Sequence, residues 1–134
     1  MRGYFTRSVD ARRIGGYMGA KEESIITKWL NYCMICGKPR EHMHHSLYGN
    51  KHKLADEDKL LMPLCQYHHQ DSKHGVHFNK EMKVLSQQLA QACWQRHYLA
   101  EKLTECDELG HQSADDWINE SANAFKQRYG EFYL

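Results

Sequence analysis

Residues 33–69 read CMICGKPREHMHHSLYGNKHKLADEDKLLMPLCQYHH, and two short turns within them carry metal-binding side chains. Two residues separate Cys33 from Cys36, and the same spacing separates Cys65 from His68. A structural zinc ion takes four thiolate or imidazole ligands in a tetrahedron, and proteins commonly supply them from two such turns. The sequence therefore predicts one structural zinc ion bound by these four side chains.

The chain between the two turns predicts a β-hairpin whose ends the zinc ion holds together. Residues 42–47 form the first expected strand, and the apolar run at 60–64 forms the second. Pro63 restricts the second strand to an edge of the sheet, because proline has no N–H to donate. The polar residues 48–59, which include a Gly-Asn turn signal, are expected to form a loop. A short helix that carries His69 is expected to follow.

The chain before the first turn contains two further predicted segments. Residues 1–22 are basic and glycine-bearing without a periodic apolar pattern, which predicts a loosely structured arm. Ser24 is expected to cap a short helix that packs on the zinc module. The apolar residues of that helix are Ile25, Ile26, Trp29 and Leu30.

The chain after the second turn is expected to be helical. Asn79 is a predicted N-cap, and residues of one helical face recur after it at three- and four-residue spacing. This expected inner face consists of Met82, Leu85, Leu89, Ala92, Cys93, Arg96, Leu99, Leu103 and Cys106. Gly110 is expected to end the helix, and Ser113 with Asp116 resembles a capping box that begins a last helix over 114–129.

These patterns predict an α+β protein with three parts. Residues 1–32 form the basic arm and short helix, residues 33–79 the zinc-stapled ββα-metal module, and residues 80–134 a helical extension. The 134 residues are enough for one modest core, and no apolar run approaches the roughly 18 residues that span a membrane. The N-terminal residues lack the apolar stretch of a signal peptide, so we expect a cytosolic protein without a membrane association.

The charge of the chain is unevenly distributed. Residues 1–99 contain 15 Lys/Arg and 9 Asp/Glu, whereas residues 100–134 contain 3 and 8. A basic part joined to an acidic tail suggests a region that faces a polyanion and a separate outward surface. Ordinary solvated surface charge would give the same pattern.

Cysteine and histidine content also narrows the chemistry. Five cysteines in a cytosolic chain are metal ligands or buried thiols rather than disulfides, and the latter description fits Cys93 and Cys106. Most of the ten histidines lie between His42 and His97, mixed with the cysteine turns. Because neighbouring side chains point in different directions, His69 should face away from the zinc ion that its neighbour binds.

The histidines left over predict a second site beside the zinc. His44 and His45 stand between the two cysteine turns, and the tied hairpin should bring both to the same side as His69. In order along the chain, the pattern is Cys33-x2-Cys36, His44-His45, a polar loop, and Met62-Pro63-Leu64-Cys65-x2-His68-His69. Over residues 33–79 it resembles the HNH endonucleases of the ββα-metal class, and in detail the zinc-knuckle, small phage-type and recombination-enhancement nucleases.

This resemblance implies roles for individual residues. By position in the family motif, His45 would be the general base, and His44 and His69 would be ligands of a single catalytic divalent ion, Mg²⁺ or Mn²⁺. A family histidine one turn after the helix ligand is replaced by Lys73, which leaves His77 as the preferred third ligand and His74 as the other candidate.

The middle residue of the HNH motif has no direct counterpart in this sequence. The family asparagine orients the base, and here Asp56 is the preferred substitute, with Asn50 second. Lys51, Lys53 and Lys73 border the expected site and would contact DNA phosphates. Lys59 and the arginines of the arm, Arg2, Arg7, Arg12 and Arg13, are further candidates.

The resulting functional hypothesis is a DNA endonuclease of low sequence specificity, acting in phage DNA processing or recombination in a bacterial cytosol. The alternative is a catalytically silent zinc module that binds DNA or a protein. A redox protein that uses the CxxC turn is disfavoured, because no βαβ pattern surrounds that turn. The acidic helical tail could form a homodimer, cap the domain or recruit a protein partner.

Overall fold

The computed structural model describes residues 23–105 and 113–134, and it shows an α+β protein. Its elements are β1 (His42–His45), the 3₁₀ helix η2 (Gly49–Lys51), α2 (His52–Glu57), β2 (Leu61–Leu64), α3 (Gln66–Gln70), α4 (Lys80–Glu105) and α5 (Ala114–Tyr129). The expected arm, Cys106 and Gly110 lie outside the described residues. No helix in the described ranges is long and apolar enough to cross a membrane.

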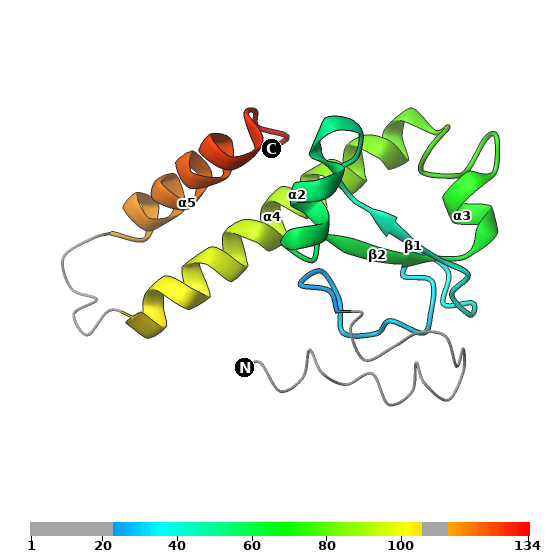
Figure 1. Ribbon diagram of the computed structural model, residues 1–134, viewed down its shortest axis with the longest axis horizontal. Helices are drawn as coiled ribbons and strands as arrows, with labels where there is room; N and C mark the ends of the chain where they lie inside the picture. The colour runs from blue at the N-terminus through cyan, green and yellow to red at the C-terminus, as the bar shows by residue number, and fades with distance from the viewer. Residues whose placement is uncertain (1–22, 106–112) are drawn as a thin grey trace.

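The two strands form a small antiparallel sheet, as the hairpin prediction required. Their register pairs His42 with Leu64 and His45 with Leu61. Pro63 pairs with Met43, which is permitted because each strand of a two-stranded sheet is an edge. The hairpin lies beside the long helix α4 (Figure 1). Helix α3 lies at the far end of the hairpin, and α5 runs along the other half of α4. The short helix after the second strand is confirmed as α3.

Residues 48–59 contain a helix where the sequence analysis expected a loop. The η2 and α2 segments together cover residues 49–57, and the sequence Lys-Leu-Ala-Asp-Glu consists mainly of good helix formers. Ala55 is fully buried at the centre of the main core, so the helix is fixed by tertiary contacts. Leu54 also packs against this core, and the polar residues that surround these two side chains in the sequence led to the loop prediction.

The helix expected after Ser24 does not form. The Ser24 hydroxyl accepts hydrogen bonds from the N–H groups of Ile26 and Thr27, but it also donates to the carbonyl of Leu61 on β2, at 2.6 Å. A serine that bonds its own backbone makes a turn that competes with a helix. This segment is therefore a turn docked on the hairpin, and Ile25 joins the core from it.

The caps of the two long helices agree with the sequence. The Asn79 side chain accepts the N–H of Met82 at 2.9 Å, and Ser113 and Asp116 form the predicted capping box before α5. The inner face of α4 is rotated from the prediction, because Leu85 is 50% exposed and Ala92 is also exposed. Cys93 is buried as predicted, and Met82 and Leu89 pack against a core cluster, but Ser86, Ala90 and Gln91 are buried where the prediction did not place them.

The C-terminal helix shares a core with α2 and with the residues that flank the two strands. Phe125 and Tyr129 of α5 are buried against Leu47, Ala55 and Leu60, among others. The carboxylate of Asp58, directly after α2, accepts hydrogen bonds from the side chains of three residues on the long helices. These are Trp94 at 2.9 Å, Arg128 at 2.5 and 2.8 Å, and Tyr129 at 2.6 Å. The carboxylate therefore ties α2 to both α4 and α5.

Candidate metal centres

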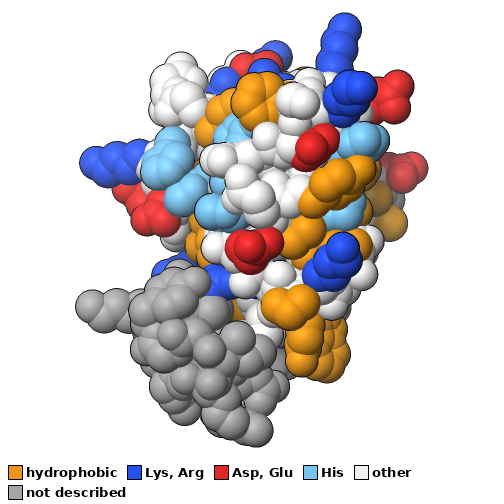
Figure 2. Space-filling view, turned by 90° about the vertical axis from the view of Figure 1, so that its right-hand side faces the viewer, with side chains coloured by type: hydrophobic (Ala, Val, Ile, Leu, Met, Phe, Trp, Pro, Cys, Tyr) orange, Lys and Arg blue, Asp and Glu red, His pale blue; other side chains and the backbone are white. Residues whose placement is uncertain are grey.

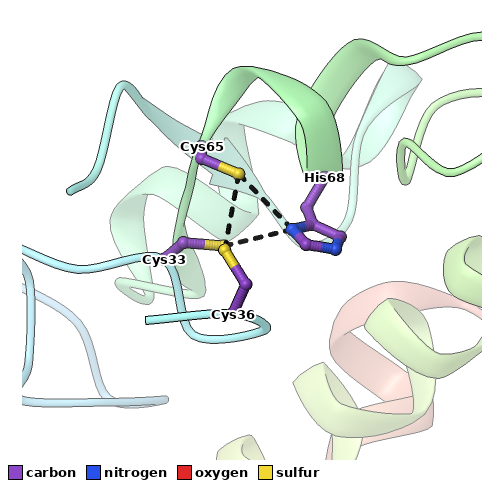
Figure 3. A group of neighbouring side chains, drawn as sticks. All are labelled: Cys33, Cys36, Cys65 and His68. Atoms are coloured by element: carbon purple, nitrogen blue, oxygen red, sulfur yellow. Dashed lines mark hydrogen bonds between the residues drawn. The ribbon is translucent and has the colours of Figure 1, made fainter. Parts of the chain in front are cut away.

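The four residues of the two cysteine turns meet at one point (Figure 3). The Nδ1 atom of His68 lies 3.4 Å from Sγ of Cys65 and 3.7 Å from Sγ of Cys33, and Sγ of Cys36 lies 3.7 Å from Sγ of Cys65. Zn–S bonds of about 2.3 Å and Zn–N bonds of about 2.0 Å, at tetrahedral angles, separate ligand atoms by roughly 3.5 to 3.8 Å. This Cys3His group could therefore hold a zinc ion.

Backbone hydrogen bonds give the first cysteine turn its shape. The N–H of Gly37 donates to the carbonyl of Cys33 at 2.8 Å, and Gly37 adopts a φ of 77°, which glycine tolerates without a steric penalty. The N–H of Met34 donates to the carbonyl of Pro63 at 3.0 Å, which fastens the turn to β2. The second turn leads directly into α3, whose first turn includes His68.

The protein environment adjusts the acidity of the two buried thiols. Burial alone would raise the pKa of Cys33, but the hydrogen bonds from the backbone of Cys65, Cys36 and Ile35 outweigh it and lower that pKa overall. The pKa of Cys65 is raised, mainly by burial and also by the neighbouring thiols. Zinc binds thiolates, so Cys33 is prepared for deprotonation, whereas the ion would have to deprotonate Cys65.

A second group consists of three histidines from three different segments. One ring nitrogen each from His44 on β1, His69 on α3 and His77 before α4 can be chosen so that all lie within 4.8 Å of one another. The Nε2 atoms of His69 and His77 are 3.0 Å apart. His44 and His69 are buried, whereas His77 is exposed, so the group is open to solvent on one side. Several histidine side chains reach the surface on the face that includes α3 (Figure 2).

A tight turn after α3 places His77 in this group. The N–H of Val76 donates to the carbonyl of His68 at 2.8 Å, and the N–H of His77 donates to that of His69 at 3.4 Å. Only glycine fits at position 75, because a Cβ there would lie 2.6 Å from the backbone nitrogen of Asp71. His74, the other candidate ligand, instead bonds the carboxylate of Asp71 through Nδ1 at 2.9 Å.

The histidines of this group are held in the neutral form. Burial, together with the nearby His77, His69 and His45, lowers the pKa of His44 to about 3. Burial and the neighbouring His77 and His42 lower the pKa of His69 to about 4. A neutral imidazole has a nitrogen lone pair, so these side chains can bind a cation at neutral pH without first losing a proton.

His45 stands at the edge of the histidine group and contacts α2. Its Nε2 atom lies 3.1 Å from the Oδ1 atom of Asp56, and its ring lies 3.8 Å, centroid to centroid, from the ring of His52. Asp56 and His52 are four residues apart and therefore lie on one face of α2. With Nε2 engaged by the carboxylate, Nδ1 of His45 remains the nitrogen that can accept a proton from another molecule.

The other predicted site residues, Asn50 and the lysines expected to contact DNA, do not gather at one place. Asn50, the second candidate for orienting the base, is exposed in η2. The Lys51 ammonium pairs with Glu131 at 2.5 Å and lies over the ring of Tyr133, so it faces the C-terminal segment. Lys53 and Lys73 are exposed. Lys59 is partly buried, and the arginines of the arm lie outside the described residues.

Three residues near the histidine group were missed by the sequence analysis. The ring of Tyr48 lies edge-on to His44 and His77, at 5.7 and 5.5 Å between centroids. The Lys83 ammonium lies 5.2 Å from the Tyr48 ring centroid. Burial of His77 lowers the pKa of that histidine most, and the positive charge of Lys83 lowers it further. Ser86 contacts His44 from α4. For Lys83, the signal was its position in the first turn of the helix that begins at Lys80, three residues after His77.

No family model matches this chain, and neither a curated protein nor a solved structure matches it.

Proposed function

We propose that this protein is a metal-dependent endonuclease that hydrolyses DNA phosphodiester bonds, with β1, β2 and α3 as an HNH-type ββα-metal core. One observation carries the proposal: His45, oriented by a carboxylate, stands next in sequence and in space to a group of three neutral histidines. Two adjacent residues of one strand thus have different partners, which is the arrangement that a base beside a bound cation requires.

The residues divide the chemistry between them. Asp56 holds the Nε2–H of His45 and fixes the ring, so that Nδ1 takes the proton from the attacking water. The cation held by His44, His69 and His77 would supply positive charge to the scissile phosphate and the leaving oxygen. Lys83 and Lys73 offer positive charge for flanking phosphates.

The ligand set bears on which cation is used. Three imidazoles and no carboxylate make up the group among the described residues. Imidazole suits transition metals, whereas Mg²⁺ prefers oxygen ligands. Of the two ions expected from the family, Mn²⁺ is therefore the better fit.

The test is nicking of supercoiled plasmid by the full chain with Mn²⁺, and separately with Mg²⁺. His45→Ala is expected to lose about 10²- to 10⁴-fold in rate, the usual contribution of a general base, with zinc content unchanged. His74→Ala is the matched control, since this exposed histidine bonds Asp71 rather than the histidine group.

Two results would count against the proposal. A wild-type protein that stays inactive with every divalent metal while retaining zinc would identify a silent zinc-binding module instead. If His45→Ala nicked as fast as His74→Ala, the assignment of the base would be wrong.

A further inference from the structure

A buried serine on the long helix contacts the most buried member of the histidine group. Ser86 of α4 is fully buried, and its Oγ atom lies 3.4 Å from Nε2 of His44. The same oxygen donates to the backbone carbonyl of Ser46, two residues further along the chain from His44, at 3.2 Å. Ala90, Leu89, Met82 and Trp94 of α4 belong to or pack against the apolar clusters, and Ser86 places a buried hydroxyl among them.

The single proton of the Ser86 hydroxyl decides which atom donates in the hydrogen bond between Ser86 and His44. A serine hydroxyl has one proton, and here that proton goes to the carbonyl of Ser46, a group that is buried and needs a donor. The hydroxyl oxygen is then left as an acceptor, so the Nε2 atom of His44 must be the one that carries hydrogen. A neutral imidazole has a single N–H, and Nδ1 of His44 therefore keeps its lone pair.

We propose that Ser86 is a positioning residue that holds His44 in the Nε2–H form, so that Nδ1 is the nitrogen offered to a divalent cation by the three-histidine group. This inference rests on the proposed function only in requiring that the group binds a cation. Helix α4, which lies outside the hairpin and α3, would thus orient one of the metal-binding histidines. Outer-shell groups that fix a ligand histidine commonly contribute 10- to 100-fold to metal affinity.

The first measurement is the tautomer of His44 in the full chain, loaded with one zinc ion per chain so that the three-histidine group stays free of metal. Long-range ¹H–¹⁵N NMR spectra distinguish Nδ1–H from Nε2–H, and the wild type is expected to show Nε2–H. In Ser86→Ala the signal should shift toward a mixture of tautomers. A wild-type His44 that carries its hydrogen on Nδ1 would overturn the proposal without reference to any activity.

The second measurement is the affinity for Mn²⁺, by titration of the same zinc-loaded proteins. Ser86→Ala is expected to bind Mn²⁺ about 10- to 100-fold more weakly than the wild type. Ser121→Ala is the matched control, because Ser121 is another fully buried helix serine whose hydroxyl bonds Gln95 and Ile118. It should lose comparable packing and bind Mn²⁺ like the wild type.

The outcomes separate this inference from the nuclease proposal. Equal Mn²⁺ affinity in Ser86→Ala and wild type, or equal loss in Ser86→Ala and Ser121→Ala, would overturn the role of Ser86. If Mn²⁺ binds, Ser86→Ala weakens that binding, and the wild type still fails to nick DNA, then the positioning role holds and only the proposed activity fails.

Discussion

The Cys3His group and the three-histidine group share α3, but they differ in ligand chemistry and in access. His68 and His69 are adjacent, and each faces a different group. The first group has three sulfur atoms and one nitrogen at separations that suit a closed tetrahedron. The second has three nitrogen atoms, two on buried residues and one on the exposed His77.

This difference indicates which group stabilises the fold and which can react. A zinc ion with four protein ligands has no position for a substrate, whereas three ligands leave room for water or a phosphate oxygen. The closed group ties the first cysteine turn to α3, and the open group lies beside His45. The predictions below test that division of roles, beginning with the largest expected effect.

Removal of one ligand from the closed group should unfold the protein. Structural zinc commonly contributes about 10–16 kcal/mol of apparent binding free energy, as much as the whole folding stability of a domain. Cys36→Ser is therefore expected to lose zinc and most of its far-UV circular dichroism signal at room temperature. Cys93→Ser is the control, because this buried thiol lies outside the group and its loss should leave zinc bound.

Removal of one ligand from the open group should abolish the second metal site and leave the fold intact. His69→Gln is expected to lose measurable Mn²⁺ binding and at least about 100-fold in nicking rate, while zinc content stays constant. His74 is the comparison, because it is exposed and bonds Asp71, so His74→Gln should behave like the wild type. Loss of zinc from His69→Gln would show that the two groups are not independent.

The smallest effect concerns acid stability without added divalent metal. The pKa of His69 is lowered to about 4 in the folded protein, whereas an unfolded histidine titrates near 6.5. The unfolded chain therefore binds the extra proton first, so this contribution to stability is complete above about pH 6.5 and decreases as the pH falls toward 4.

Urea unfolding across this pH range measures that contribution. His69→Gln should reduce the slope of unfolding free energy against pH by at most about 1.4 kcal/mol per pH unit. Both proteins keep the zinc group, so its own titration affects them equally. Identical slopes would show that His69 is not held neutral by burial.

The parts of the structure that the sequence predicted depend on local patterns. The cysteine turns, the strands of the hairpin and the capping box at Ser113 each need only a few neighbouring residues to form. The meeting of His44 and His69 followed from the zinc-tied hairpin, and the resemblance to a known motif added His77 as the preferred third ligand. The nuclease activity and the nucleic-acid contacts stay predictions.

The parts that the sequence did not predict depend on distant contacts. The helix α2 is fixed by Ala55 in the core, and the turn after Ser24 is fixed by a hydrogen bond to Leu61, neither of which has a local signal. The face of α4 was assigned by hydrophobicity, so the exposed Leu85 was counted inward and the buried Ser86 was overlooked. Ser86 can be buried because it contacts His44, which is 42 residues away in sequence and gives no local signal.

The carboxylate of Asp58 has a consequence for how the chain can be shortened. It accepts hydrogen bonds from α4 and α5, and it stands two residues after Asp56, the proposed partner of His45. A fragment that ended before residue 113 would remove Arg128 and Tyr129 and leave this charge without two of its partners. The hairpin, α2 and the C-terminal helix should therefore unfold in a single cooperative step, and proteolysis in the last helix should disorder the proposed base.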